Sequence, residues 1–264
     1  MALPIDSGYL RNSTQKSQSW GWLVQIYLKP KKVFASMNES AKAAWVKPML
    51  VLSVLAAILS LAGGPSRLLI AQQQINTMPQ DFQYWTEEQQ IQYIQGQQAL
   101  QGDLFIYVFP LLKSLAELWL GWLALASILH LLMTIRGSRI SHQSYLNLIA
   151  WAGMPFALRS IVQTLYILIT HNTLQGLGLS GLVVIGEDKL HIFLSILLSM
   201  IDLYSLWFIF LLFLASPGIS GLKPLKARFI LVVSLLIFTI LAALPNFLLS
   251  ILGNIGKIQP FIMF

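Results

Sequence analysis

Four charged residues stand inside segments that are otherwise apolar. They are Lys113, Glu117, Arg159 and Asp202. A charge at the centre of a bilayer costs about 2.5–3.5 kcal/mol on insertion scales, so such side chains normally face the interior of a helix bundle and find partners there. Two kinds of chemistry fit these residues: ion pairs that hold helices together, or a path for protons or ions through the membrane.

The positions of these charges favour pairing. Lys113 and Glu117 are four residues apart and share a helix face. Counted from the inner ends of their segments at about 1.5 Å per residue, Glu117, Arg159 and Asp202 reach similar depths. We therefore predict an Arg159–Asp202 ion pair with Glu117 nearby and Lys113 closer to the outer surface. This cluster carries no net charge, which favours a structural role over conduction.

The elements that must position these charges are membrane-spanning helices. The chain has 264 residues, of which 56% are hydrophobic and only 10% are charged, whereas soluble domains have about a quarter of charged residues. Several apolar runs reach the roughly 20 residues that a helix needs to cross a bilayer. The sequence predicts an all-α integral membrane protein with five transmembrane helices, at about 45–65, 103–135, 145–170, 191–215 and 229–252.

The charges between the spans predict the topology. The formal net charge is +7, and the basic residues cluster at the edges of apolar segments, which indicates topology signals rather than a nucleic-acid partner. Basic and non-basic connections alternate along the chain, which places the N-terminus in the cytoplasm and the C-terminus outside. The remaining segments are a cytoplasmic N-terminal segment (1–44), a glutamine-rich outer connection (66–102) and a short outer tail (253–264).

Two groups of basic residues are candidates for contacts with lipid headgroups. One lies beside aromatic residues in the N-terminal segment, a mixture that predicts an amphipathic stretch at the membrane interface. The other lies in the last inner connection, where such residues also act as plain topology signals. The two groups are Lys29, Lys31 and Lys32, and Lys223, Lys226 and Arg228.

The outer connection predicts one or two short helices. Thr86 is followed by two acidic residues and resembles a helix start. Phe82, Trp85, Ile91 and Ile94 are spaced irregularly but can line one side of such helices. This segment either packs on the bundle or forms a docking surface for a partner, and the sequence leaves both interpretations open.

No motif predicts an enzyme. The chain contains no cysteine, which excludes thiolate metal sites and thiol catalysis. Its four histidines are scattered, and no nucleotide-binding or metalloprotease motif is present. We therefore predict no catalytic, cofactor-binding or metal-binding residue.

Several local patterns follow one another in the chain. They are the segments "KPKKVFASM" before "WVKPMLVLSVL", "RGSRISHQSYLNLIAWAGMPFAL", "IDLYSLWFIFLL" and "GISGLKPLKA". In their order and spacing these segments resemble the Yip family of five-span membrane proteins (Ypt/Rab-interacting proteins), in its prokaryotic branch. The resemblance runs from about Lys29 to Leu248. The resemblance implies the same five-span topology. Eukaryotic members are associated with small-GTPase binding and vesicle traffic, and some bacterial relatives are linked to ATP-driven exporters.

These observations lead to two hypotheses. The first is a non-enzymatic membrane scaffold or accessory subunit of a larger complex in a bacterial plasma membrane, with an ATP-binding-cassette exporter as the most concrete candidate. Its partners are membrane lipids and other membrane proteins, whether an exporter or further copies of the chain. The contacts are expected on small-residue faces at Gly121/Ala124 and Ala150/Gly153 and on the outer connection. The alternative is a small transporter or channel that uses Glu117, Arg159 and Asp202 directly. Pro155 and Pro245 interrupt two spans and keep this alternative open.

Overall fold

The computed structural model describes residues 20–40, 43–75, 79, 81–172, 178–182 and 189–255. Within these ranges every regular element is helical, and five helical segments are long and apolar enough to cross a membrane. The five segments are Val46–Gln73, Leu104–Ile135, His142–Thr170, Leu203–Ser220 and Pro224–Ser250. The predicted class, an all-helical membrane protein with five spanning helices, is confirmed. The orientation of the termini stays a prediction. Residues 1–19 and 41–42 of the predicted N-terminal segment, and residues 256–264 of the predicted outer tail, lie outside the described residues.

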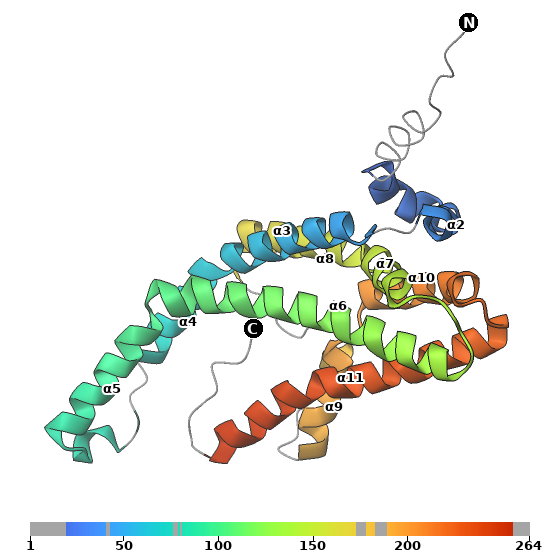
Figure 1. Cartoon of the computed structure of the whole chain (residues 1–264). Helices are drawn as coiled ribbons and strands as arrows, with labels where there is room; N and C mark the ends of the chain where they lie inside the picture. Colours follow the sequence, from blue (N-terminus) through green and yellow to red (C-terminus); the bar gives the residue numbers. More distant parts are fainter. Residues whose placement is uncertain are drawn as a thin grey trace, which may run out of the picture. The chain divides into compact units, whose positions relative to one another are not determined.

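The elements follow one another in chain order (Figure 1). Residues 20–28 form the first described helix. The elements after it are α2 (Pro30–Ser40), α3 (Val46–Ala62), α4 (Gly64–Ile75), η1 (Phe82–Tyr84), α5 (Glu87–Leu100), η2 (Leu104–Val108), α6 (Phe109–Ile135), α7 (His142–Ala152), α8 (Pro155–Thr170), η3 (Gly178–Leu182), α9 (Lys189–Ser199), α10 (Leu203–Ser220) and α11 (Pro224–Ile255).

The predicted span at 191–215 differs most from the structure. It is two helices, because α9 ends at Ser199 and α10 begins only at Leu203. The α9 helix is shorter than a bilayer requires, and α10 alone is long and apolar enough to span. Since hydropathy averages over a window, it does not detect a break that leaves both flanks apolar.

Two further boundaries follow local chemistry. The first span continues past its predicted end, because α4 follows α3 after a single turn residue, Gly63. Within the third span, α7 ends at Ala152 and α8 begins at Pro155. Proline suits the first turn of a helix, where its missing N–H needs no partner. Pro245 lies inside α11 and does not end it.

Contacts divide the chain into two compact units. The first unit comprises Met1–Val51, Gly121–Phe156 and Gly176–Phe264, and the second unit comprises Leu52–Leu120 and Ala157–Gln175. The boundary runs through α3, α6 and α8, so each of these helices contributes to both units.

In the first unit, α7 is the central buried helix. Tyr145 and Trp151 at its two ends are both fully buried, and α7 packs against α10 and α2. Just beyond its end, the ring of Phe156 lies 5.3 Å from the ring of Phe208 on α10. Figure 1 shows α11 passing beside α9 and α10. The core of this unit is therefore built around aromatic side chains of α7.

The N-terminal helices dock onto this core. Trp22 packs edge-on against Trp151, with 5.6 Å between the ring centroids. The Tyr27 hydroxyl donates a hydrogen bond of 2.7 Å to the carbonyl oxygen of Met154, and its ring lies 5.7 Å from that of Trp207. Burial raises the pKa of Tyr27 to about 12, so the hydroxyl keeps the proton that it donates.

The turn before α3 is fixed to α7 by two hydrogen bonds. The Trp151 indole donates to the carbonyl oxygen of Ala44 at 3.0 Å. The backbone N–H of Trp45 donates to Oδ1 of Asn147, also at 3.0 Å. The first bond satisfies a carbonyl group of the turn, and the second satisfies an N–H group at the helix start, which otherwise lacks a partner. They set where the first spanning helix begins relative to α7.

The connection between α6 and α7 is ordered by its own backbone. Gly137 has a φ of +100°, and the N–H of Ser138 donates to the carbonyl oxygen of Met133 at 2.9 Å. This is the hydrogen-bond pattern of a Schellman motif, which favours glycine. The Ser138 hydroxyl then donates to the carbonyl oxygen of Ser220 at 2.8 Å and joins this turn to the end of α10.

In the second unit, the connection that is predicted to lie outside contains a small folded element, residues 81–100, which we call the outer element. Thr86 caps α5 in a capping box with Gln89, which confirms the predicted helix start. The rings of Phe82, Trp85 and Tyr93 lie 5.4 to 5.7 Å apart in a cluster. The Gln90 side chain donates to the carbonyl oxygens of Phe82 and Trp85 at 3.0 and 3.2 Å. The outer element is thus held by its own contacts.

The start of α4 leads to a test of packing in the second unit. A Cβ atom on Gly64 would lie 2.0 Å from Cε1 of Tyr107. We expect Gly64→Ala to lower the free energy of unfolding by about 1–3 kcal/mol, because the aromatic ring must move. Thermal unfolding in detergent measures this change.

Gly96 is the matched control for this prediction. Nothing lies within 4 Å of the position that its Cβ would take. Gly96→Ala is therefore expected to be neutral or to stabilise α5 by up to about 1 kcal/mol through helix propensity. Equal losses for the two variants would contradict the packing described at Tyr107.

Candidate functional site

The four predicted intramembrane charges belong to different units. Lys113 and Glu117 lie on α6 in the second unit, where Nζ and Oε1 are 3.8 Å apart. Their side chains are 43% and 61% exposed, so the pair lies on the surface of the chain. Arg159 lies half-buried on α8 in the second unit, and Asp202 lies in the first. The Arg159–Asp202 pairing therefore stays a prediction.

Asp202 has a role that sequence reasoning missed. It is the N-cap of α10, and its Oδ1 accepts a hydrogen bond of 2.7 Å from the backbone N–H of Ser205. The Ser205 hydroxyl in turn accepts from the backbone N–H of Asp202 at 2.7 Å. This reciprocal capping box satisfies two backbone N–H groups at the helix start. A carboxylate in this apolar segment is explained by the helix that begins after it.

The short helix η3 packs against the break between α9 and α10. The N–H of Leu179 on η3 donates to the carbonyl oxygen of Ile201 at 3.0 Å. Gly178 has a φ of +63°, and a Cβ there would lie 2.6 Å from the carbonyl oxygens of Ile201 and Ser199. Glycine is required on both counts, since other residues disfavour this conformation and have no room for a side chain. The carbonyl groups at the end of α9 and in the break thus lie against η3.

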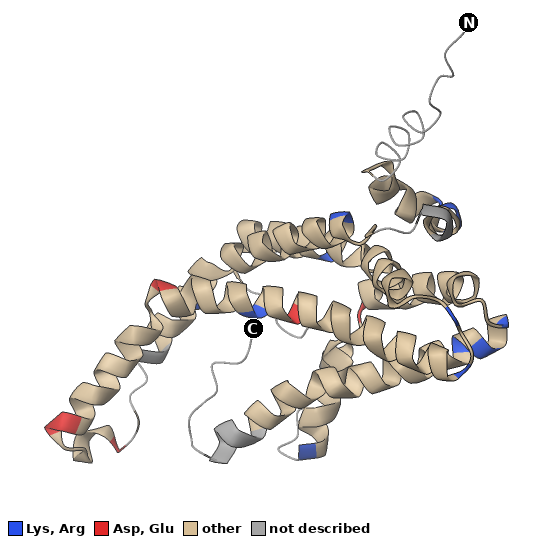
Figure 2. Cartoon of the chain, in the orientation of Figure 1, with Lys and Arg blue, Asp and Glu red and all other residues tan. Residues whose placement is uncertain are grey.

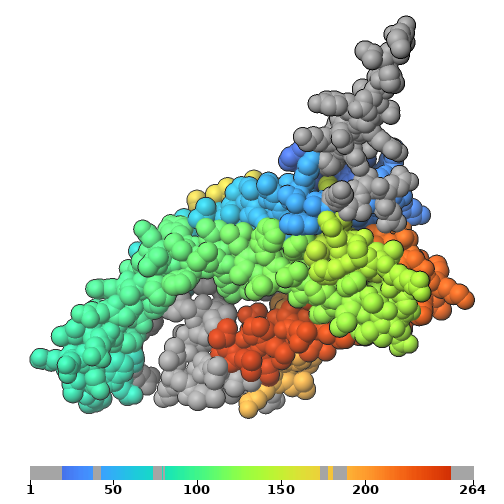
Figure 3. All heavy atoms as spheres, viewed as in Figure 1, coloured from blue at the N-terminus to red at the C-terminus, as the bar shows by residue number. Residues whose placement is uncertain are grey.

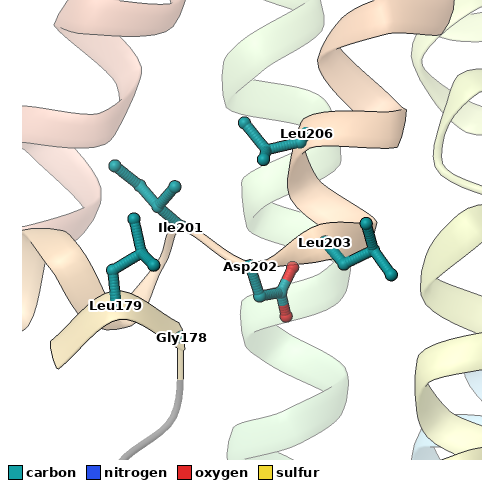
Figure 4. Close-up of a pocket in the computed structure, with 6 residues that line it drawn as sticks. All are labelled: Gly178, Leu179, Ile201, Asp202, Leu203 and Leu206. Atoms are coloured by element: carbon teal, nitrogen blue, oxygen red, sulfur yellow. The ribbon is translucent and has the colours of Figure 1, made fainter. Parts of the chain in front are cut away.

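A cavity of about 400 Å³ lies at this break. Its lining residues are Gly178, Leu179, Ile201, Asp202, Leu203 and Leu206. Figure 4 shows the Asp202 carboxylate beside these leucine and isoleucine side chains. Among the six residues Asp202 is the only one with a charged side chain. One carboxylate at a helix N-terminus, among apolar side chains, provides a polar group without a second charged side chain in this lining.

Arg67 falls within the predicted outer connection (66–102) but is a buried charge. It lies on α4, inside the first candidate span, and is only 7% exposed. Its Nε donates to the carbonyl oxygen of Ile106 at 2.9 Å, and a second guanidinium nitrogen donates to the carbonyl oxygen of Ser60. Ile106 belongs to η2, a π-helix, a form that occurs mostly as single turns next to or within α-helices. Arg67 thus ties α3, α4 and η2 together in the second unit.

A sequence signal for Arg67 existed. The apolar run "RLLIA" continues after "GGP", so the helix resumes beyond the glycine pair and carries the arginine into the span. Proline after a glycine pair suits the first turn of a new helix. A first span that ends at Pro65 leaves Arg67 outside it, so the burial of Arg67 was not predicted.

The predicted lipid-contact residues lie on the surface of the first unit. Lys29, Lys31, Lys32, Lys223, Lys226 and Arg228 are all exposed. Figure 2 shows Lys and Arg on α2 and at the beginning of α11. Lys226 also has a structural contact, because its Nζ donates to the carbonyl oxygen of Arg136 at 2.7 Å. Contact with lipid headgroups stays a prediction for these residues.

No metal centre is formed by the part of the chain that the structure describes, since no three residues among His, Asp and Glu gather there. Two histidines do meet: the ring centroids of His130 and His142 lie 5.2 Å apart. Nε2 of His142 is also 3.2 Å from the Ser127 hydroxyl. These contacts join α6 to α7 within the first unit.

Comparison with known proteins gives one match. A family model described as the Yip1 domain matches residues 24–245. No curated protein and no solved structure matches the chain.

The capping role of Asp202 makes a prediction that separates it from an ion pair. Asparagine caps helices about as well as aspartate, whereas alanine costs about 0.5–2 kcal/mol. We expect Asp202→Asn to keep wild-type thermal stability in detergent and Asp202→Ala to lower it, because the N–H of Ser205 then loses its acceptor. If Asp202→Asn destabilises the protein as much as Asp202→Ala, the charge itself matters, as an ion pair with Arg159 requires.

Proposed function

Because the chain belongs to the Yip1 domain family, whose model covers residues 24–245, we propose that this membrane protein is a non-enzymatic scaffold or accessory subunit of a larger membrane complex. An ATP-binding-cassette exporter in a bacterial inner membrane is the most concrete complex. The resemblance to prokaryotic members of the family supports that choice of membrane and partner.

The observation that carries the proposal is the outer element. In α5, no residue is buried, and Ile91 and Ile94 are 54% and 40% exposed. Its helix is nevertheless ordered by a capping box and by the aromatic cluster of Phe82, Trp85 and Tyr93. Figure 3 shows α5 at the surface of the face that is drawn. An ordered surface that the described residues leave uncovered is suited to a partner, because little entropy is lost on binding.

The chemistry of α5 favours a protein partner. Its sequence, "EEQQIQYIQGQQAL", is rich in glutamine, and each glutamine side chain offers both donors and acceptors. Glu87 and Glu88 lie in the first turn, where they complement the helix dipole. Figure 2 shows acidic residues at the beginning of α5 and no basic residue on it. This polar surface with two exposed isoleucines resembles the polar rim and apolar centre of a protein interface.

The small-residue faces are less suited to partners. The position of a Cβ on Gly121 lies 3.7 Å from the Phe238 ring, and Ala150 is only 1% exposed. Packing within the first unit therefore uses Gly121 and Ala150, whereas Ala124 is exposed. The outer element is the better partner surface of those that the sequence suggested.

The break between α9 and α10 favours a second candidate, a small transporter or channel. Transport sites are often built where spanning helices are discontinuous. The break at residues 200–202, with Asp202 lining a cavity, has this character. The contacts made by Asp202 and Gly178 account for the same residues structurally, so we rank the scaffold first.

The scaffold proposal is tested by affinity purification from the native host in gentle detergent, with crosslinking and mass spectrometry of the proteins that co-purify. We expect a stoichiometric membrane assembly with crosslinks to the outer element. Replacing both exposed isoleucines (Ile91→Ser with Ile94→Ser) should reduce the recovered partner by at least about fivefold, which corresponds to about 1 kcal/mol of binding free energy.

The matched control changes the neighbouring glutamines (Gln92→Ser with Gln95→Ser), which are also exposed. It should retain the partner. A clean monomer or homo-oligomer from the native host would overturn the scaffold proposal.

The transporter predicts a different result in liposomes. Purified protein should then carry a proton or cation flux, followed with a pH-sensitive dye or a voltage-sensitive dye. Asp202→Asn should abolish this flux while the protein keeps its thermal stability, because asparagine preserves the cap but not the charge. Protein that carries no flux of either kind counts against the transporter.

A further inference from the structure

The helix at residues 20–28 has two apolar faces. Trp22 and Ile26 are 6% and 0% exposed and pack into the first unit. Trp20, Val24 and Leu28 are 55%, 64% and 74% exposed. These three residues are spaced four apart and form a stripe along the helix surface. We call them the exposed stripe. One face of the helix is thus anchored on protein, and the other has no covering from the described residues.

Basic residues follow the stripe directly. Lys29, Lys31 and Lys32 are all exposed. From residue 20 to residue 38 the sequence contains no Asp or Glu. An apolar stripe beside lysines is the pattern of helices that lie in the membrane interface, where the apolar side enters the lipid and the lysines meet phosphates. Positive charge without acidic neighbours favours an anionic ligand over a neutral one.

A contact at the start of α3 places the stripe near the membrane surface. Nζ of Lys47 lies 4.8 Å from the ring centroid of Trp20, a cation–π contact. Lys47 is the second residue of the first candidate span, Val46–Gln73. Trp20 therefore lies where a spanning helix begins, and tryptophan is enriched at this level of the bilayer. The hydrogen bond from Trp45 to Asn147 holds this helix start in place.

We propose that the helix at 20–28 and the first turn of α2 form a binding surface for the headgroups of anionic phospholipids. The exposed stripe lies at the boundary between headgroups and acyl chains, and Lys29, Lys31 and Lys32 contact the phosphates. The buried face of the same helix, with Trp22 and Ile26, packs on the core of the first unit and holds the binding surface in place. The surface is distinct from the outer element, so it does not depend on the proposed partner.

The absence of cysteine from the sequence makes a direct test practical. A spin label is attached to full-length protein carrying Val24→Cys, in nanodiscs of phosphatidylcholine with or without phosphatidylglycerol. Its collision rates with lipid-soluble oxygen and with a water-soluble nickel reagent report its depth. We expect a shift toward oxygen when phosphatidylglycerol is present, and a loss of that shift when Lys29, Lys31 and Lys32 are all changed to Gln. A label at Gln92→Cys, on the exposed surface of α5, is the aqueous reference.

The control for charge removes three basic residues elsewhere. Changing Arg136, Arg139 and Lys189 to Gln, which are also exposed, leaves the contact of Lys226 with the backbone carbonyl of Arg136 intact and should leave the shift at position 24 unchanged. The proposal is overturned if the label at position 24 is as accessible to nickel as the label at position 92 in both lipid mixtures. It is also overturned if the shift persists without the three N-terminal lysines, or if protection at position 24 requires a bound protein.

Discussion

The need to satisfy backbone groups where a helix is interrupted in an apolar setting governs this structure. Water is absent from the core of a bilayer, so an unpaired N–H or C=O group there costs several kcal/mol. At specific places, side chains and turns supply hydrogen-bond partners for these backbone groups. Arg67 donates to the carbonyl oxygens of Ser60 and Ile106 beside the π-helix η2, and Asp202 caps α10 after the break that follows α9.

The same constraint explains why polar residues occur in apolar segments. Asn147 is almost fully buried, and it accepts the N–H of Trp45 at the start of α3. The indole of Trp151 donates to the carbonyl oxygen of Ala44 one residue earlier. Each of these polar groups completes the hydrogen bonding of a neighbouring backbone segment. Burying a polar group is favourable only with such a partner, so these positions are determined by helix ends rather than by a ligand.

Part of the fold and of the candidate site could be predicted from the sequence. The rest could not, for physical reasons. The five spans follow from hydropathy, because a spanning helix needs a long apolar run. Thr86 could be recognised as a cap because its helix is polar and begins after a turn. Asp202 makes the same kind of cap, but the apolar residues on both sides hide the break. The contact between η3 and Ile201 joins residues more than 20 positions apart, and no periodicity in the sequence encodes it.

The distribution of satisfied and exposed groups bears on function. Arg67 and Asp202 already make hydrogen bonds to backbone groups, so their presence in the membrane domain has a structural reason. The Lys113–Glu117 pair balances its own charge along one helix. Two ordered surfaces are exposed in the described fold. They are the outer element and the exposed stripe with the lysines that follow it. One is polar with two exposed isoleucines, and the other is apolar and basic, so they suit a protein and an anionic membrane surface respectively. Buried polar groups that serve helix ends, together with these two exposed surfaces, are the physical argument for the proposed scaffold.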